Sequence, residues 1–228
     1  FRCQNRCQYA HCPLYLIFKN IATWFNTMIH RQTKLHFILF FGLLLICLMT
    51  SSVAWAIDKE RLVIDARSQI GKTVSYDPAY TQLSYPMGDV PINKGVCTDV
   101  VIRALRHQDM DLQKLIHEDM KQNFSAYPKK WGLKSPDKNI DHRRVPNIAT
   151  YFKRKGYQVK DGVYKSGDIV TWDLGSGLVH IGIVSDKKSQ SRVPLIIHNI
   201  GSGTKEENIL YKFKITGHYR IPQNHHHD

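Results

Sequence analysis

The chain has 228 residues, of which 32 are Lys or Arg and 19 are Asp or Glu, so its formal net charge is +13. A protein this basic tends to associate with anionic polymers such as cell-wall polymers, lipid headgroups or nucleic acid. Nucleic acid is disfavoured because the sequence has no dense cluster of Lys and Arg with interleaved aromatic residues. The sequence also shows no internal repeat and no low-complexity tract.

The segment before the first methionine, Met28, has no helix or strand pattern. We interpret residues 1–27 as an upstream segment that is not part of the natural protein. A metal knuckle is the alternative interpretation, but the matched second pair of ligands that a zinc site needs is missing. The residues that would form such a knuckle are Cys3, Cys7, His11 and Cys12.

Residues 28–56 have the pattern of a secretory signal peptide. Arg31 and Lys34 give a positive leader, residues 37–49 form an apolar run of 13 residues, and an Ala-x-Ala cleavage pattern ends at Ala56. A run of this length is short for crossing a bilayer, although an uncleaved anchor is the alternative. We therefore predict a periplasmic or secreted protein that meets the membrane only during export.

Residues 57–222 are predicted to form one domain that is large enough to bury a core, and we expect it to be a monomer. Residues 223–228 form a His-containing tail to which we assign no role. Helical patterns come first in the domain and strand patterns second, which is typical of an α+β fold with helices packed on an antiparallel sheet. The expected helices are residues 58–70, 97–107, a segment from residue 111, and 146–155. The expected strands are residues 168–172, 178–184, 194–200, 208–215 and 218–221, and we expect irregular loops at residues 73–94 and 123–145.

Cys97 is the only cysteine that remains after cleavage of the predicted signal peptide. Exported proteins usually pair their cysteines in disulfides, so a single thiol is expected to be either buried and inert or functional. Cys97 stands where a turn becomes a helix, and the positive end of the helix dipole favours the thiolate. The sequence thus offers a candidate nucleophile.

A cysteine nucleophile needs a base, and the base needs a group that orients its ring. His180 is the candidate base, since it lies within an apolar strand pattern where an imidazole must find a partner. His198 and Asn199 end the next strand, and either can bond the far ring nitrogen of His180; we favour His198. The backbone N–H of Cys97 is expected to contribute to an oxyanion hole. A tyrosine is expected to supply a second donor, with Tyr76 and Tyr85 as candidates.

These residues carry a family resemblance. Cys97 at a helix start, Gly167-Asp168-Ile169-Val170 and His180-Ile181-Gly182-Ile183-Val184 resemble the papain-like fold of NlpC-type and CHAP-type cell-wall amidohydrolases. The chain is more similar still to an exported bacterial family catalogued as a domain of unknown function. The motifs that carry this second resemblance are Tyr85-Pro86-Met87-Gly88-Asp89-Val90-Pro91, Gly95-Val96-Cys97-Thr98-Asp99-Val100, Asp141-His142-Arg143-Arg144-Val145-Pro146 and His198-Asn199-Ile200-Gly201.

The resemblance implies that Cys97 is the nucleophile, His180 the general base and His198 the polar third residue. Asp99 stands where the NlpC-type families have Gly in Asp-Cys-Ser-Gly, so we count it among the substrate-binding candidates. The run at residues 141–144 departs from the NlpC pattern. In it, either His142 or Arg143 grips a substrate carboxylate, or the run forms a buried ion-pair network.

The predicted function is an exported thiol hydrolase that cleaves an amide bond in peptidoglycan stem peptides through a Cys97 thioester, without a cofactor or metal. Peptidoglycan or a peptide is therefore the expected partner. An acyltransferase or transpeptidase on the same site is one alternative. A non-catalytic wall-binding module with an inert Cys97 is another. A zinc site formed by Cys97, His180 and His198 is a third, although these residues lack the close spacing typical of zinc ligands.

Overall fold

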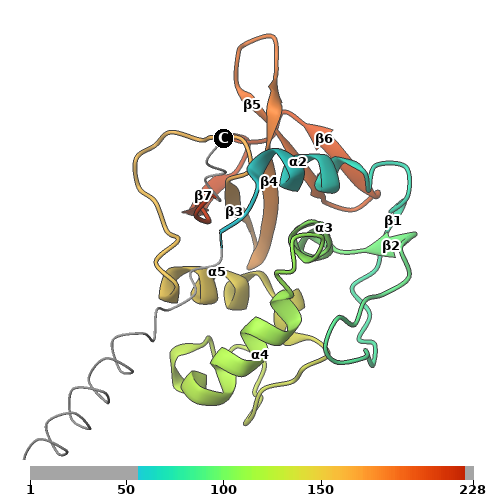
Figure 1. The fold of residues 1–228 in the computed structure, drawn as a ribbon, viewed down its shortest axis with the longest axis vertical. Helices are drawn as coiled ribbons and strands as arrows, with labels where there is room; N and C mark the ends of the chain where they lie inside the picture. The colour runs from blue at the N-terminus through green and yellow to red at the C-terminus, as the bar shows by residue number, and fades with distance from the viewer. Residues whose placement is uncertain (1–55, 224–228) are drawn as a thin grey trace, which may run out of the picture. The chain divides into compact units, whose positions relative to one another are not determined.

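The computed structural model describes residues 56–223 of the chain (Figure 1). The predicted upstream segment, the signal peptide up to its last residue and the histidines of the tail lie outside the described residues. None of the described helices is both long enough and apolar enough to cross a membrane.

The second half of the domain is a five-stranded sheet in which every neighbouring pair of strands is antiparallel. The order across the sheet is β6-β5-β4-β3-β7. Ser176 and Gly177 both have positive φ, which is the conformation of a type I′ turn, so they connect β3 and β4 as a tight hairpin. The strands are β3 (Ile169–Gly175), β4 (Leu178–Lys188), β5 (Pro194–Asn199), β6 (Thr204–Glu207) and β7 (Lys214–Tyr219).

Helices make up most of the first half of the domain. The side chain of Asp58 accepts a hydrogen bond from the N–H of Arg61, and Asp111 does the same for Gln113, so both residues cap a helix start. Pro146 lies in the first turn of the last helix, where a missing N–H is tolerated. The helices are α2 (Lys59–Arg67), α3 (Cys97–Arg106), α4 (Leu112–Asn123) and α5 (Val145–Arg154), with short 3₁₀ turns η2 (Phe124–Ala126) and η3 (Asp141–Arg143).

The sheet has a buried cluster on each face. Ile169, Ile181 and Ile183 pack on one face against the helices, and α3 is buried along nearly its whole length. Figure 1 shows α2 and α3 beside β4. Trp172 and Val184 belong to a smaller cluster on the opposite face. The expected α+β plan is thus confirmed as a mixture of helices and an antiparallel sheet.

Two sequence predictions are wrong in this region. The strand expected at residues 208–215 is one of them: residues 208–213 form turns and bends, and strands lie before and after them, at β6 and β7. The apolar residues Ile209 and Leu210 suggested a strand, but they cover the smaller cluster, and the carbonyl of Leu210 accepts a 2.9 Å hydrogen bond from the Trp172 indole. The stretch expected to be irregular also contains a short parallel pair, β1 (Ser75–Tyr76) with β2 (Lys94–Gly95).

Candidate active site

Cys97 is the first residue of α3, directly after β2 and Val96. Its side chain is buried with the helix-side cluster, and the residue is 4% exposed. The backbone N–H of Ile181 in β4 lies close enough to the thiol to lower its pKa. The candidate nucleophile therefore lies against the backbone of the strand that carries His180.

The edge of β4 explains this contact. The N–H and C=O of Val184 both point toward the β3 side, where they bond Asp168 and Gly167. Because successive residues of a strand point their backbone groups to opposite sides, the N–H of Ile181 points toward β5. The β4–β5 pairing reaches Ile183 and stops there. The Cys97 side chain thus lies beside the part of β4 that β5 leaves unpaired.

His180 bonds His198 in the way that the sequence predicted. The Nε2 atom of His180 lies 3.0 Å from Nδ1 of His198, and the two rings are nearly perpendicular. Strand alternation places His180 on the face of Trp172, whose ring centroid lies 5.8 Å from that of His180. The imidazole leans toward β5, and neither His180 nor His198 lines the pocket of Cys97. No hydrogen bond joins Cys97 to the His180 ring within residues 56–223.

Gly182 makes room for this histidine pair. A Cβ at Gly182 would lie 2.6 Å from a methyl of Ile196 and 3.1 Å from the Cβ of His198. Both atoms belong to β5, so a side chain at this position would push His198 away from His180. The glycine in His180-Ile181-Gly182 is therefore required by the close approach of the neighbouring strand.

Burial determines the protonation of the candidate pair. It raises the pKa of the Cys97 thiol to about 12, despite the opposing effect of the Ile181 N–H. It lowers the pKa of His180 to about 3. Both groups are therefore neutral at pH 7. The expectation of a thiolate favoured by the helix start is wrong for this buried arrangement, because desolvation outweighs the helix terminus.

Asp99 and Arg143 form a buried ion pair, and Arg143 also lines the Cys97 pocket. The Asp99 carboxylate accepts bonds from the N–H of Val96 at 2.6 Å and from two guanidinium nitrogens of Arg143. The same guanidinium donates to the carbonyls of Ala79 and Asp77. Since these bonds occupy it, Arg143 fits the ion-pair alternative better than the substrate-gripping one. Asp99 is likewise engaged in fixing the start of α3.

The two candidate tyrosines lie in different places. Tyr76 lines the pocket of Cys97, and burial followed by the nearby Cys97 raises its pKa to about 12. Tyr85 does not line that pocket. Its hydroxyl donates to Glu118 at 2.7 Å, and its ring packs on His117 of α4. Tyr85 is thus removed from the candidate site, and Tyr76 stays as the possible second donor.

His142 lies outside the Cys97 pocket, and Asn199 makes its hydrogen bonds away from the sulfur. His142 does not line the Cys97 pocket, and burial followed by the positive charge of Arg106 lowers its pKa to about 3. A neutral, buried imidazole is unsuited to binding a carboxylate. The prediction that His142 binds a substrate carboxylate is therefore wrong. Asn199 donates to the carbonyls of Ser75 and Gly95, which ties β5 to the β1–β2 pair. His198, and not Asn199, therefore bonds His180.

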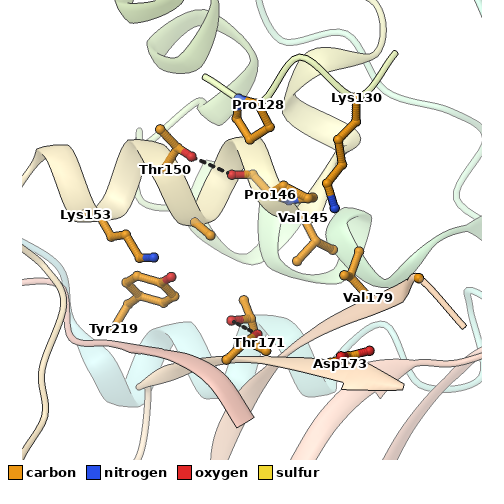
Figure 2. Close-up of a pocket in the computed structure, with 13 residues that line it drawn as sticks. Pro128, Lys130, Val145, Pro146, Thr150, Lys153, Thr171, Asp173, Val179 and Tyr219 are labelled. Carbon is orange, nitrogen blue, oxygen red and sulfur yellow. Dashed lines mark hydrogen bonds between the residues drawn. The ribbon is translucent and has the colours of Figure 1, made fainter. Parts of the chain in front are cut away.

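Cys97 opens into a pocket of about 200 Å³. A second pocket of about 340 Å³ adjoins it, and both are lined by Val145, Pro146 and Val179. Figure 2 shows the second pocket between Lys130 and Pro146 above and Thr171 and Asp173 below. The shared lining makes the two pockets one groove that runs from Cys97 along the start of α5.

Trp131 and Arg144 are among the residues of the Cys97 pocket that sequence reasoning did not propose. Trp131 lines it, and the Arg144 guanidinium lies 4.0 Å from the Trp131 ring centroid. The aromatic content of the long loop was the available signal. Among residues 56–223, no three His, Cys, Asp or Glu side chains are grouped so as to hold a metal ion, so the zinc alternative has no ligand set there.

A family model matches most of the chain. Residues 63–221 match the family described as "Domain of unknown function (DUF1287)". "Uncharacterized protein YijF" from Escherichia coli (strain K12) is 58% identical over 159 residues, which is 68% of this chain and 78% of that protein. The structure of NlpC1 from Trichomonas vaginalis is 14% identical with a TM-score of 0.42, and the match covers 75% of this chain and 46% of that chain, less than half its length. The chain therefore belongs to the DUF1287 family.

Proposed function

We propose that the protein is an exported thiol hydrolase that cleaves an amide bond in peptidoglycan stem peptides. One observation carries the proposal: the buried thiol of Cys97 lies close to the backbone N–H of Ile181, the residue that follows His180 in β4, and His180 is hydrogen-bonded to His198. A thiol, an imidazole and a polar group that orients the imidazole are the parts that thiol acyl transfer needs. The motif resemblance to NlpC-type and CHAP-type amidohydrolases, and with it a papain-like fold, supports the same proposal.

The proposed reaction passes through a thioester. The Cys97 sulfur attacks the amide carbon while its proton moves to Nδ1 of His180. The tetrahedral oxyanion takes a hydrogen bond from the backbone N–H of Cys97, with the Tyr76 hydroxyl as the candidate second donor. The C–N bond then breaks, and the leaving amine takes the proton from His180. Water, deprotonated by His180, then attacks the thioester carbon, the C–S bond breaks, and the proton returns from His180 to the Cys97 sulfur as the acid is released.

The neutral state of the pair shapes the first step. Because the thiol pKa is raised to about 12 and the His180 pKa is lowered to about 3, a stable thiolate–imidazolium pair does not form before substrate arrives. Proton transfer must therefore accompany the attack on the carbonyl. A substrate polar enough to solvate the developing charges would ease the transfer.

The groove supports a peptide as the substrate. It extends from Cys97 past Val179 into the second pocket, so an extended chain can place its scissile amide at the sulfur. The lining of the second pocket includes Lys130, Lys153 and Asp173. Carboxylate and amine groups of a wall peptide would each meet an opposite charge there. The positive net charge of the chain also supports a cell-wall substrate, because it attracts anionic wall polymers.

Incubation of the mature protein with purified peptidoglycan, followed by mass analysis of the released fragments, tests the proposal. We expect wild-type protein to release fragments with new carboxyl and amine ends, and Cys97→Ala and Cys97→Ser to release none. Thermal unfolding of both variants serves as the fold control. Equal release by Cys97→Ala and wild type would refute the proposal.

A non-catalytic wall-binding module is the second candidate, because the Cys97 thiol is buried and neutral. In this case Cys97→Ala binds insoluble peptidoglycan as tightly as wild type, and neither protein releases fragments. Co-sedimentation with peptidoglycan, measured beside the fragment analysis, separates the two candidates.

A further inference from the structure

We propose that Glu207 is a positioning residue that fixes the tautomers of His198 and His180, and so decides which nitrogen of His180 is free to accept a proton. The proposal adds Glu207 as a fourth residue to the set of interacting side chains formed by Cys97, His180 and His198. The tautomers themselves follow from geometry alone, whereas their importance for catalysis rests on the proposed function.

The strand register brings Glu207 to His198. Glu207 pairs with Ile196 across the β5–β6 ladder, and His198 pairs with Lys205. Because side chains alternate between faces, Glu207 and His198 lie on the same face of the sheet, diagonally opposed across the two strands. The Glu207 Oε2 atom lies 3.2 Å from the Nε2 atom of His198.

The Nε2 atom of His198 has no other hydrogen-bond partner among the described residues. His198 is completely buried, and this nitrogen makes no hydrogen bond of good geometry within the described residues. The Glu207 carboxylate at 3.2 Å is misaligned, but its side chain is 41% exposed and has room to rotate onto the ring N–H. An uncompensated buried N–H is costly, so this carboxylate is the acceptor that the histidine requires.

The tautomers follow from one proton count. A neutral imidazole carries one N–H and one lone pair. If the N–H of His198 is on Nε2 and donates to Glu207, its Nδ1 is an acceptor. The atom 3.0 Å from that Nδ1 is Nε2 of His180, which must then carry the proton of His180. The Nδ1 atom of His180 is left with the lone pair that a general base needs.

Charges around His198 act in both directions. Burial lowers the pKa of His198, while the Glu207 carboxylate raises it, and Lys205 and Lys212 lower it further. Burial and the two lysines favour a neutral ring. A neutral His198 is what the tautomer argument requires, since a doubly protonated ring would leave no acceptor for His180.

Glu206 provides a matched control on the adjacent position. Its side chain lies on the opposite face of β6, where it bonds Arg67 and Ser185. Substitution of Glu206 therefore changes the charge and the packing of the same strand without touching the histidine pair. The two variants Glu206→Ala and Glu207→Ala thus separate a general effect on β6 from a specific effect on His198.

Nitrogen-15 NMR of histidine-labelled protein at pH 7 tests the tautomers directly. We expect Nε2–H tautomers for both His180 and His198 in wild type, in Glu206→Ala and in Glu207→Gln, because glutamine keeps an acceptor oxygen. In Glu207→Ala we expect His198 to populate the Nδ1–H form and His180 to follow. Peaks are assigned with His180→Asn and His198→Asn. Wild-type Nδ1–H at His198, or unchanged tautomers in Glu207→Ala, would overturn the proposal.

The same variants are then assayed for fragment release. We expect Glu207→Ala to lower the rate at least about tenfold and Glu207→Gln to retain most of it, because loss of an orienting partner misplaces a ring proton. Absence of activity in every variant and in wild type would sink the proposed hydrolase but leave the tautomer result intact. A tautomer shift in Glu207→Ala with an unchanged rate would refute the positioning role.

Discussion

Arg143 donates two hydrogen bonds to the Asp99 carboxylate, of 3.0 Å to Oδ1 and 2.9 Å to Oδ2. The two residues are 44 positions apart in the sequence. Both side chains are at least 97% buried. Removal of one partner leaves a buried charge without compensation, which costs about 3–5 kcal/mol. We therefore expect Arg143→Met to lower the free energy of unfolding by this amount in urea titrations. The exposed-pair variant Lys121→Met is the control and should cost less than about 1 kcal/mol.

The alkylation rate of Cys97 should report its raised pKa. Since the thiolate is the reactive form and the pKa is about 12, we expect the rate with iodoacetamide to keep rising with pH from 6 to 10. The urea-unfolded chain, in which the thiol has its ordinary pKa, is the reference and should react much faster at pH 7. A plateau of fast labelling already at pH 5 would show that the resting protein holds a thiolate–imidazolium pair instead.

A bulky residue at the junction of the two pockets should block the groove. Val179 lines both pockets and is 37% exposed, so Val179→Trp is expected to fill the junction without disturbing the core. We expect at least a tenfold fall in fragment release with a small change in melting temperature. Val163→Trp, at an exposed position outside both pockets, is the matched control. Full activity of Val179→Trp would mean that the substrate does not cross this junction.

Acid should destabilise the protein through its buried histidines. The pKa of His142 is lowered to about 3 by burial and by Arg106, whereas an unfolded histidine titrates near 6.5. Between these values the unfolded state binds one more proton, so stability is full above about pH 6.5 and falls as pH drops toward 3. The expected contribution of His142 is about 1.4 kcal/mol per pH unit.

Urea titrations at a series of pH values measure this slope. His142→Asn should reduce the slope below pH 6 by roughly that amount. Parallel curves for His142→Asn and wild type would contradict the assignment.

Local patterns in the sequence were sufficient for much of the fold. Asp58, Asp111 and Pro146 mark helix starts that the structure confirms, since caps act through residues that are neighbours in sequence. The predicted hydrogen bond between His180 and His198 is also confirmed, because strand alternation and the antiparallel pairing of β4 with β5 are enough to place the two side chains together. These features depend on short-range geometry.

The errors came from long-range packing. Ile209 and Leu210 look like strand residues, yet they cover Trp172, and nothing in their neighbours reveals this. The thiolate expectation for Cys97 used the helix terminus and missed the depth of burial, which depends on the whole sheet. Likewise, the Arg143 side chain is engaged by Asp99 and by two carbonyls near residue 78, which no spacing rule connects.

The placement of Glu206 and Glu207 on opposite faces restricts how the preceding turn can evolve. A shift of β6 by one residue would turn both carboxylates to the other face of the strand, so that at most one of Arg67 and His198 would keep a carboxylate beside it. Single-residue insertions or deletions between β5 and β6 should therefore be rare in the family, whereas changes by two residues preserve the facing of the strand. The length of this turn is thus expected to vary in even steps.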